Sequence, residues 1–139
     1  MSEAHGQGRS ALAVGDQLPS WRRLISQAVI AAYAEASGDH NPVHLDPEYA
    51  RRAGLPGTIA HGLLTLGTAC AAVESWAGDT GFVARVSCRF SAPVRSGEEL
   101  VCSGRVAAVS ETTATLDLSA ITGGGERALS RARAELRKL

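Results

Sequence analysis

A long uncharged run in the middle of the chain constrains the fold most strongly. Residues 58–73 contain no Asp, Glu, Lys or Arg, and a helix is predicted from about His61 to Ala77, where Glu74 is the first charge. Its positions after Gly62 are apolar or small on every side, so we expect a helix that is enclosed all round by the protein. The run falls short of the ~20 apolar residues that span a bilayer, so it is not predicted to cross a membrane.

The segments after this helix alternate between apolar and polar residues with the period of β-strands. Strands are expected at residues 82–92, 100–108 and 113–120, and the first of them places on its predicted inner face Phe82, Ala84, Val86, Cys88, Phe90 and Ala92. Residues 127–139 also fit a helical period, but the turn at Gly123–Gly125 favours a hairpin strand. One apolar helix followed by antiparallel strands predicts a single α+β domain whose sheet curls around that helix.

The first part of the chain carries helix boundaries that can be recognised from residue type. Residues 21–25 are predicted to form a short strand. Ser26 is a good N-cap residue and Gly38 suits the left-handed position that ends a helix, so a helix is expected between them. Asp46 followed by Pro47 predicts the start of a second, short helix that ends near residue 53.

Composition limits the partners and the compartment. The 139 residues include 14 basic and 14 acidic side chains, so no net charge favours nucleic acid or an anionic membrane. Three cysteines without a CxxC pair suit a reducing compartment, and we expect a cytoplasmic protein. Residues 1–10 have no apolar core and are predicted to be a disordered tail, with the folded domain at residues 11–139.

A bent loop is predicted between the first two helices. Asn41 and Pro42 favour a turn, because proline has no amide hydrogen and disfavours a helical conformation in the residue before it. The loop therefore brings the side chains of Asp39 and His44 in from two arms. A carboxylate and an imidazole held in this way can share proton transfers on one small substrate.

A second candidate element of the site is Ile59-Ala60-His61-Gly62, about seventeen residues after the loop. Gly62 opens the central helix, whose first amides are unpaired and lie at the favourable dipole end for negative charge. The Gly62 amide is therefore a candidate oxyanion donor. We interpret His61 as a structural residue that bonds near the site, and Asn41 as a brace of the loop.

These residues resemble a known family. The run Tyr33-x-x-x-Ser37-Gly38-Asp39-x-Asn41-Pro42-Val43-His44 resembles the signature of the MaoC-like, (R)-specific hydratase/dehydratase family. The resemblance covers about residues 12–139 and extends to four further runs, at residues 14–19, 60–65, 75–79 and 89–94. In particular, the chain is similar to the catalytic subunit of the heterodimeric (3R)-hydroxyacyl-acyl-carrier-protein dehydratases of actinobacteria.

The resemblance implies a hotdog fold and an enzyme that dehydrates (3R)-hydroxyacyl thioesters reversibly to trans-2-enoyl thioesters. It implies the acid–base pair Asp39 and His44 and the oxyanion donor Gly62, supported by Asn41, Pro42 and His61. The substrate would be an acyl-carrier-protein or coenzyme A thioester of a fatty acid or polyketide pathway. It implies no metal and no cofactor. A dimer is expected, either of two copies or with a second hotdog subunit, because one such domain leaves sheet edges unpaired.

Other interpretations stay open. The chain could be a stand-alone (R)-specific enoyl-CoA hydratase, or an acyl-binding subunit of a heterodimeric dehydratase. A hotdog thioesterase is disfavoured, because the central helix carries no acid before Glu74. His40 and His44 have the spacing of a helical metal pair, but Pro42 between them interrupts a helix. Asp39 and His44 could also be no more than local capping residues of a polar loop.

Overall fold

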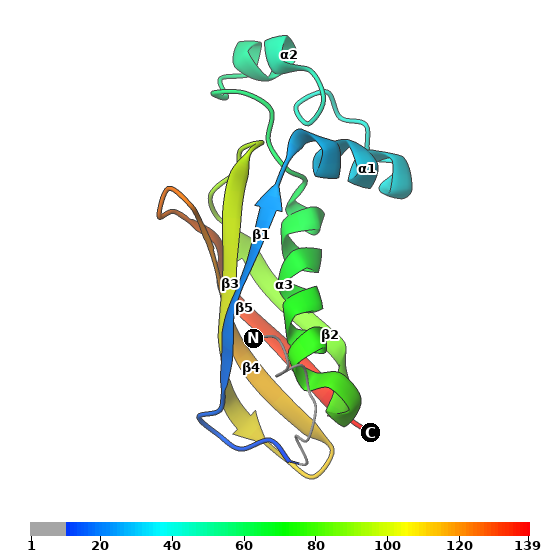
Figure 1. Ribbon diagram of the computed structural model, residues 1–139, viewed down its shortest axis with the longest axis vertical. Helices are drawn as coiled ribbons and strands as arrows, with labels where there is room; N and C mark the ends of the chain where they lie inside the picture. The colour runs from blue at the N-terminus through cyan, green and yellow to red at the C-terminus, as the bar shows by residue number, and fades with distance from the viewer. Residues whose placement is uncertain (1–10) are drawn as a thin grey trace.

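Five antiparallel strands form a sheet that curves around one long helix (Figure 1). The computed structural model describes residues 11–139, so the tail predicted at residues 1–10 lies outside the described residues. The sheet has the order β1-β3-β4-β5-β2, and its strands are Gln17–Ile25 (β1), Gly81–Phe90 (β2), Glu98–Val109 (β3), Thr113–Thr122 (β4) and Arg127–Lys138 (β5). The predicted hotdog arrangement, a sheet wrapped around a central helix in a single domain, is confirmed.

Two short helices, α1 (Gln27–Ser37) and α2 (Pro47–Arg52), lie together beyond one end of the sheet (Figure 1). Their predicted boundaries are confirmed. The Ser26 side chain accepts a hydrogen bond from an amide in the first turn of α1, and Gly38 ends the helix at φ 81°. Asp46 caps α2 in the same way as Ser26 caps α1. These caps place the loop between the two helices beside the start of the central helix.

The central helix α3 (Gly62–Ala77) is buried on one side only. Its inner face, which packs on the sheet, includes Ala69, Val73 and Trp76. On its outer face, Leu63 is 62% exposed. The expectation that this helix is enclosed on all sides is therefore wrong for the single chain. The curved sheet covers one side of the helix, and an apolar composition does not reveal whether the same chain also covers the other.

The predicted inner face of β2 is also wrong in part. Phe82 and Phe90 are 43% and 56% exposed, while Val83, Val86 and Cys88 pack against the core. The pairing of β2 with β5 shifts register twice, between Val83 and Arg85 and between Ser87 and Arg89. Each irregularity of this kind interrupts the alternation of side chains, so strict period two fails to predict which residues face inward.

The two ends of the sheet differ in how well they were predicted. The first strand was expected at residues 21–25 but begins at Gln17, with an irregular register between Leu18 and Trp21. The last segment is strand β5, as predicted, and it pairs with β4 across the glycine turn. Within residues 11–139, no helix combines the length and hydropathy required to cross a bilayer.

Candidate active site

The loop that follows α1 is bent by hydrogen bonds between near neighbours. The Asp39 amide donates to Ser37 Oγ (3.1 Å), the Asn41 amide to Asp39 Oδ1 (3.1 Å), and the Val43 amide to Asn41 Oδ1 (3.1 Å). Side chains of this type commonly bond to the backbone two residues further on and so stabilise turns. The loop therefore holds the Asp39 carboxylate in place while leaving it exposed.

His44, at the other end of this loop, is buried, with 8% of its surface exposed. Its amide donates to the Asn41 carbonyl oxygen (3.0 Å), and its ring atom Nδ1 lies 2.8 Å from the Ile59 carbonyl oxygen. A carbonyl oxygen only accepts, so Nδ1 carries the hydrogen. In the neutral ring, Nε2 then has the free lone pair that a general base requires.

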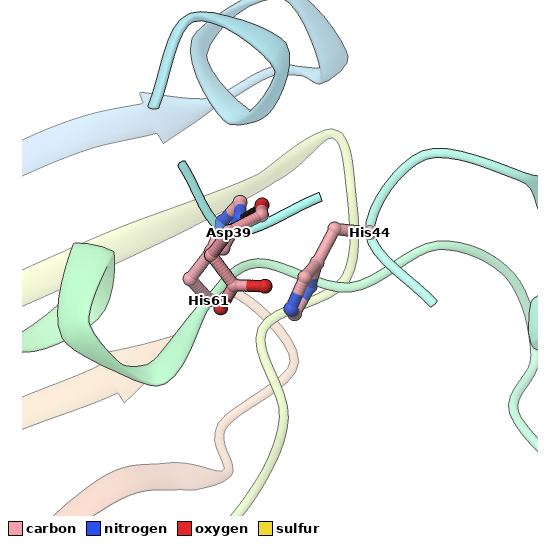
Figure 2. Close-up of side chains that lie close together, drawn as sticks. All are labelled: Asp39, His44 and His61. Atoms are coloured by element: carbon pink, nitrogen blue, oxygen red, sulfur yellow. Dashed lines mark hydrogen bonds between the residues drawn. The ribbon is translucent and has the colours of Figure 1, made fainter. Parts of the chain in front are cut away.

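His61 lies immediately before α3, next to Asp39 (Figure 2). Its Nε2 lies 3.0 Å from the backbone carbonyl oxygen of Asp39 and donates to it. Its ring stacks on His44 with centroids 3.8 Å apart and an interplanar angle of 24°. On its other neighbour, Tyr33, the centroid distance is 4.7 Å and the rings are tilted by 59°. The ionisable atoms of Asp39, His44 and His61 all lie within 4.8 Å of one another.

Two polar residues that sequence reasoning missed connect this cluster to α1. Gln27 Nε2 donates to the backbone carbonyl oxygen of His44 (2.9 Å), and Thr58 Oγ1 donates to Gln27 Oε1 (2.7 Å). Thr58 is buried just before the start of α3. No motif or spacing singles out Gln27 and Thr58, because their partners lie 17 and 31 residues away in the sequence.

Gly62 is the first residue of α3, so its amide is one of the unpaired donors of a helix start. A Cβ added to Gly62 would lie 3.1 Å from two ring carbons of Phe90, which is tighter than an ordinary contact. The glycine thus permits Phe90 to close over the start of the helix. Phe90 was predicted to face the core, and its place at this site was not anticipated.

A cavity of about 500 Å³ opens beside these groups and is lined by Tyr33, Ser37, Asp39, His61, Gly62, Leu63 and Phe90. His44 does not line it, but an ionisable ring nitrogen of His44 is within 4.8 Å of the Asp39 carboxylate. A groove of about 570 Å³ shares Tyr33 with this cavity. The groove is lined mostly by apolar or small residues, among them Leu24, Val29, Leu64 and Ala71.

The cluster of Asp39, His44 and His61 has the residue types of a metal site but not its geometry. A shared ion needs ring lone pairs that converge, and these lie in the ring planes. The two imidazole planes are stacked and nearly parallel, so their lone pairs run side by side. In addition, His44 Nδ1 and His61 Nε2 are already bonded to carbonyl oxygens. These residues do not fit a single bound metal in their present arrangement.

His40 takes no part in the cluster. Its Nε2 lies 3.1 Å from Glu35 Oε2 on the exposed side of the loop. The hydrogen bond to Glu35 raises the pKa of His40 above its ordinary value. The alternative in which His40 and His44 form a metal pair therefore lacks support, because the two rings have different partners.

The thiols of the chain are not activated. Burial raises the pKa of Cys70 and Cys88, and it raises the pKa of Cys102 to about 11. A nucleophilic cysteine requires the opposite shift, toward the thiolate. The three cysteines are therefore not candidates for a nucleophilic role.

Comparison with known proteins agrees with the geometry. Residues 13–120 match the family model of the MaoC-like domain. A mitochondrial 3-hydroxyacyl-[acyl-carrier-protein] dehydratase of Arabidopsis thaliana is 36% identical over 104 residues, which are 75% of this chain and 61% of that protein. The peroxisomal enoyl-CoA hydratase 2 of the same plant is 48% identical over 67 residues, 47% of this chain and 22% of that protein. The chain thus spans less than two thirds of either relative.

Solved structures show the same fold. The (R)-hydratase from A. caviae involved in PHA biosynthesis superimposes with a TM-score of 0.86 at 28% identity, covering 94% of this chain and 99% of that one. A chain of the ChsH1-ChsH2 complex from Mycobacterium tuberculosis gives a TM-score of 0.85 at 24% identity, over 93% of this chain and 100% of that one. The second likeness concerns the fold alone.

Proposed function

The chain belongs to the family of proteins with a MaoC-like domain, and from this premise we propose that it is a hydro-lyase acting on 3-hydroxyacyl thioesters. It would dehydrate a (3R)-hydroxyacyl thioester of a growing fatty acyl or polyketide chain on an acyl carrier protein. The products would be a trans-2-enoyl thioester and water, and the reverse reaction would be a hydration. The observation that carries the proposal is the Asp39 carboxylate within 4.8 Å of an ionisable nitrogen of His44, beside a cavity that Gly62 also lines.

Each group has a role that its contacts permit. His44 Nε2 takes the proton from C2 of the substrate, because Nδ1 is committed to the Ile59 carbonyl oxygen. Asp39, as the protonated carboxylic acid, gives its proton to the departing C3 hydroxyl, which leaves as water, and the proton taken up by His44 returns to Asp39 to close the cycle. The Gly62 amide donates to the thioester oxygen as negative charge develops there, an interaction whose loss typically costs about 10²- to 10³-fold in rate. Asn41 and Pro42 shape the loop that carries Asp39.

The shape of the surroundings supports a substrate with an apolar tail. The cavity beside Asp39 takes the thioester head, and the groove beyond Tyr33 offers an apolar surface for the acyl chain. Mostly apolar walls with a few convergent polar groups are typical of small-molecule sites.

A second candidate function is a stand-alone (R)-specific enoyl-CoA hydratase. It is favoured by the likeness to the A. caviae (R)-hydratase, because this chain covers that protein almost from end to end. The two candidates share the chemistry and differ in the carrier of the acyl group. A third role, an acyl-binding subunit that does no chemistry, is disfavoured by the presence of both Asp39 and His44.

We expect the active form to be a dimer, either of two copies or with a second hotdog subunit. Among residues 11–139, the outer face of α3 exposes apolar side chains such as Leu63, and the edge strands β1 and β2 each pair with one neighbour only. The mass of the purified chain, alone and after co-expression with a candidate hotdog subunit, distinguishes the two forms. We also place the protein in the cytoplasm, since its three cysteines are unpaired.

The proposal is tested by measuring the hydration of short trans-2-enoyl thioesters on coenzyme A and on an acyl carrier protein. The reaction is monitored as a loss of enoyl absorbance. Asp39→Asn and His44→Gln should each lower turnover by about 10²- to 10⁴-fold. His40→Gln, a neighbouring change outside the cluster, is the control and should leave turnover within about twofold. Undiminished turnover in both site variants would refute the site.

A further inference from the structure

The side chain of His61 contacts both members of the acid–base pair. It donates from Nε2 to the backbone carbonyl oxygen of Asp39 at 3.0 Å, and its ring stacks on His44 at 3.8 Å. Figure 2 shows it beside Asp39 and facing the His44 ring. Its own backbone is fixed, because its carbonyl oxygen accepts from the amides of Leu64 (3.1 Å) and Thr65 (3.2 Å). A rigid helix start thus reaches both catalytic groups through one imidazole.

We propose that His61 is a positioning residue that sets the separation between the Asp39 carboxylate and the His44 ring. The inference rests on the proposed function and adds to it a residue that acts through the catalytic pair. The bond to Asp39 holds one end of the loop, and the stack on His44 holds the other end. The bond to Asp39 requires the His61 tautomer with hydrogen on Nε2, and the stack on His44 is compatible with that tautomer.

The remaining ring nitrogen of His61 supports this role. His61 is only 2% exposed, and its Nδ1 is buried without a hydrogen-bond partner among residues 11–139. A buried polar atom without a partner is destabilising, so an apolar ring would suit the packing better. The imidazole is also not used as a helix cap, since its side chain makes no capping bond. What it contributes is the Nε2 donor together with a flat face.

The same geometry excludes His61 from direct proton transfer to substrate. Its Nε2 is occupied by the Asp39 carbonyl oxygen, and its Nδ1 has no access to solvent. Its effect on the reaction therefore passes through the positions of Asp39 and His44. A change at His61 should alter kcat, whereas the affinity for the thioester should change little.

Two substitutions separate the two contacts. His61→Phe keeps a ring against His44 but loses the donor to Asp39, whereas His61→Gln keeps a donor but loses the ring. Each should lower kcat by up to about tenfold, and His61→Ala, which loses both, by about 10²-fold. KM should stay within about twofold in all three variants. His40→Gln, a histidine change on the same loop, serves as the matched control.

Folded His61→Ala with kcat within about twofold of the original would overturn the proposal, and so would a loss confined to KM. Nitrogen-15 NMR of the unmodified protein gives a second readout that needs no variant to fold. It should find the His61 hydrogen on Nε2, and hydrogen on Nδ1 would contradict the proposal. Absence of turnover on every thioester would instead defeat the proposed function. The tautomer would then still test whether His61 holds the Asp39 backbone through Nε2.

Discussion

The two segments that build the site are held in different ways. The loop arm, residues 37–44, is closed by hydrogen bonds between residues two or three apart, such as Asn41 Oδ1 with the Val43 amide. The helix arm, residues 58–62, is held by distant partners. The Ala60 amide donates to the Val94 carbonyl oxygen (2.8 Å), and the Ile59 carbonyl oxygen accepts from His44. Only where the two arms meet do Asp39, His44 and His61 come together.

The difference shows which half of the site takes its conformation from residues that are close in the sequence. The loop arm adopts its bend from residue types that favour turns, so its shape depends on a few neighbouring positions. The helix arm has no turn-forming residue pattern of this kind, and its position depends on contacts with the sheet and with α1. We expect changes in the helix arm to alter the catalytic geometry most, and local changes in the loop arm to have smaller effects on stability.

Among changes that leave the reacting side chains in place, the largest effect is expected from Gly62→Ala in the helix arm. The new methyl group would lie 3.1 Å from the Phe90 ring and force it to shift over the cavity. Because the Phe90 ring would then lie differently beside the reacting groups, kcat/KM for enoyl thioester hydration should fall by about tenfold to 10²-fold.

Gly57→Ala is the matched control for that change. It adds the same methyl group five residues before Gly62, but no atom lies within 4 Å of it, and Gly57 lines neither the cavity nor the groove. It should keep kcat/KM within about twofold, because the added methyl group displaces no neighbour. Equal activity losses in both variants would show that the Phe90 contact is not what matters.

A smaller effect should distinguish the arms by their stability. Thr58→Val removes the bond from a buried hydroxyl to Gln27 and should lower the free energy of unfolding by about 1 kcal/mol. Asn41→Ala removes an exposed bond to the Val43 amide and should cost about half as much. Urea denaturation of both variants measures the difference. A larger loss for Asn41→Ala would reverse the comparison.

The smallest effect concerns His40, on the exposed side of the loop arm. Its pKa is raised by the hydrogen bond to Glu35, so Glu35→Gln should bring the pKa of His40 back down, as followed by proton NMR titration. Because the pKa of His40 is raised in the folded state, the hydrogen bond to Glu35 stabilises the fold fully at pH values below the pKa of His40 in the unfolded chain. This stabilisation is lost as the pH rises through the folded pKa. An unchanged His40 titration in Glu35→Gln would contradict this account.

The same division explains what could be predicted from the sequence. The caps at Ser26, Gly38 and Asp46 were found because capping depends on residues a few positions apart. The loop and its signature were recognisable for the same reason. The contacts of Gln27 and Thr58 were not, since no local pattern records a partner that only folding brings close.

Two further misses have physical causes of their own. Irregular pairing with β5 turned Phe82 and Phe90 away from the face that strict alternation assigns to them. The outer face of α3 is also largely apolar, so composition alone could not show that residues 11–139 leave Leu63 exposed. The first miss hid the role of Phe90 at the cavity, and the second points to the surface where a partner subunit is expected.

The paired action of Asp39 and His44 is tested most directly by a double-mutant cycle on these two residues, using turnover of a trans-2-enoyl thioester. If the carboxylate and the imidazole act as one unit, Asp39→Asn, His44→Gln and the double variant should each fall by a similar factor, about 10²- to 10⁴-fold. If the two losses instead multiply in the double variant, the groups act independently, and the paired mechanism described here is wrong.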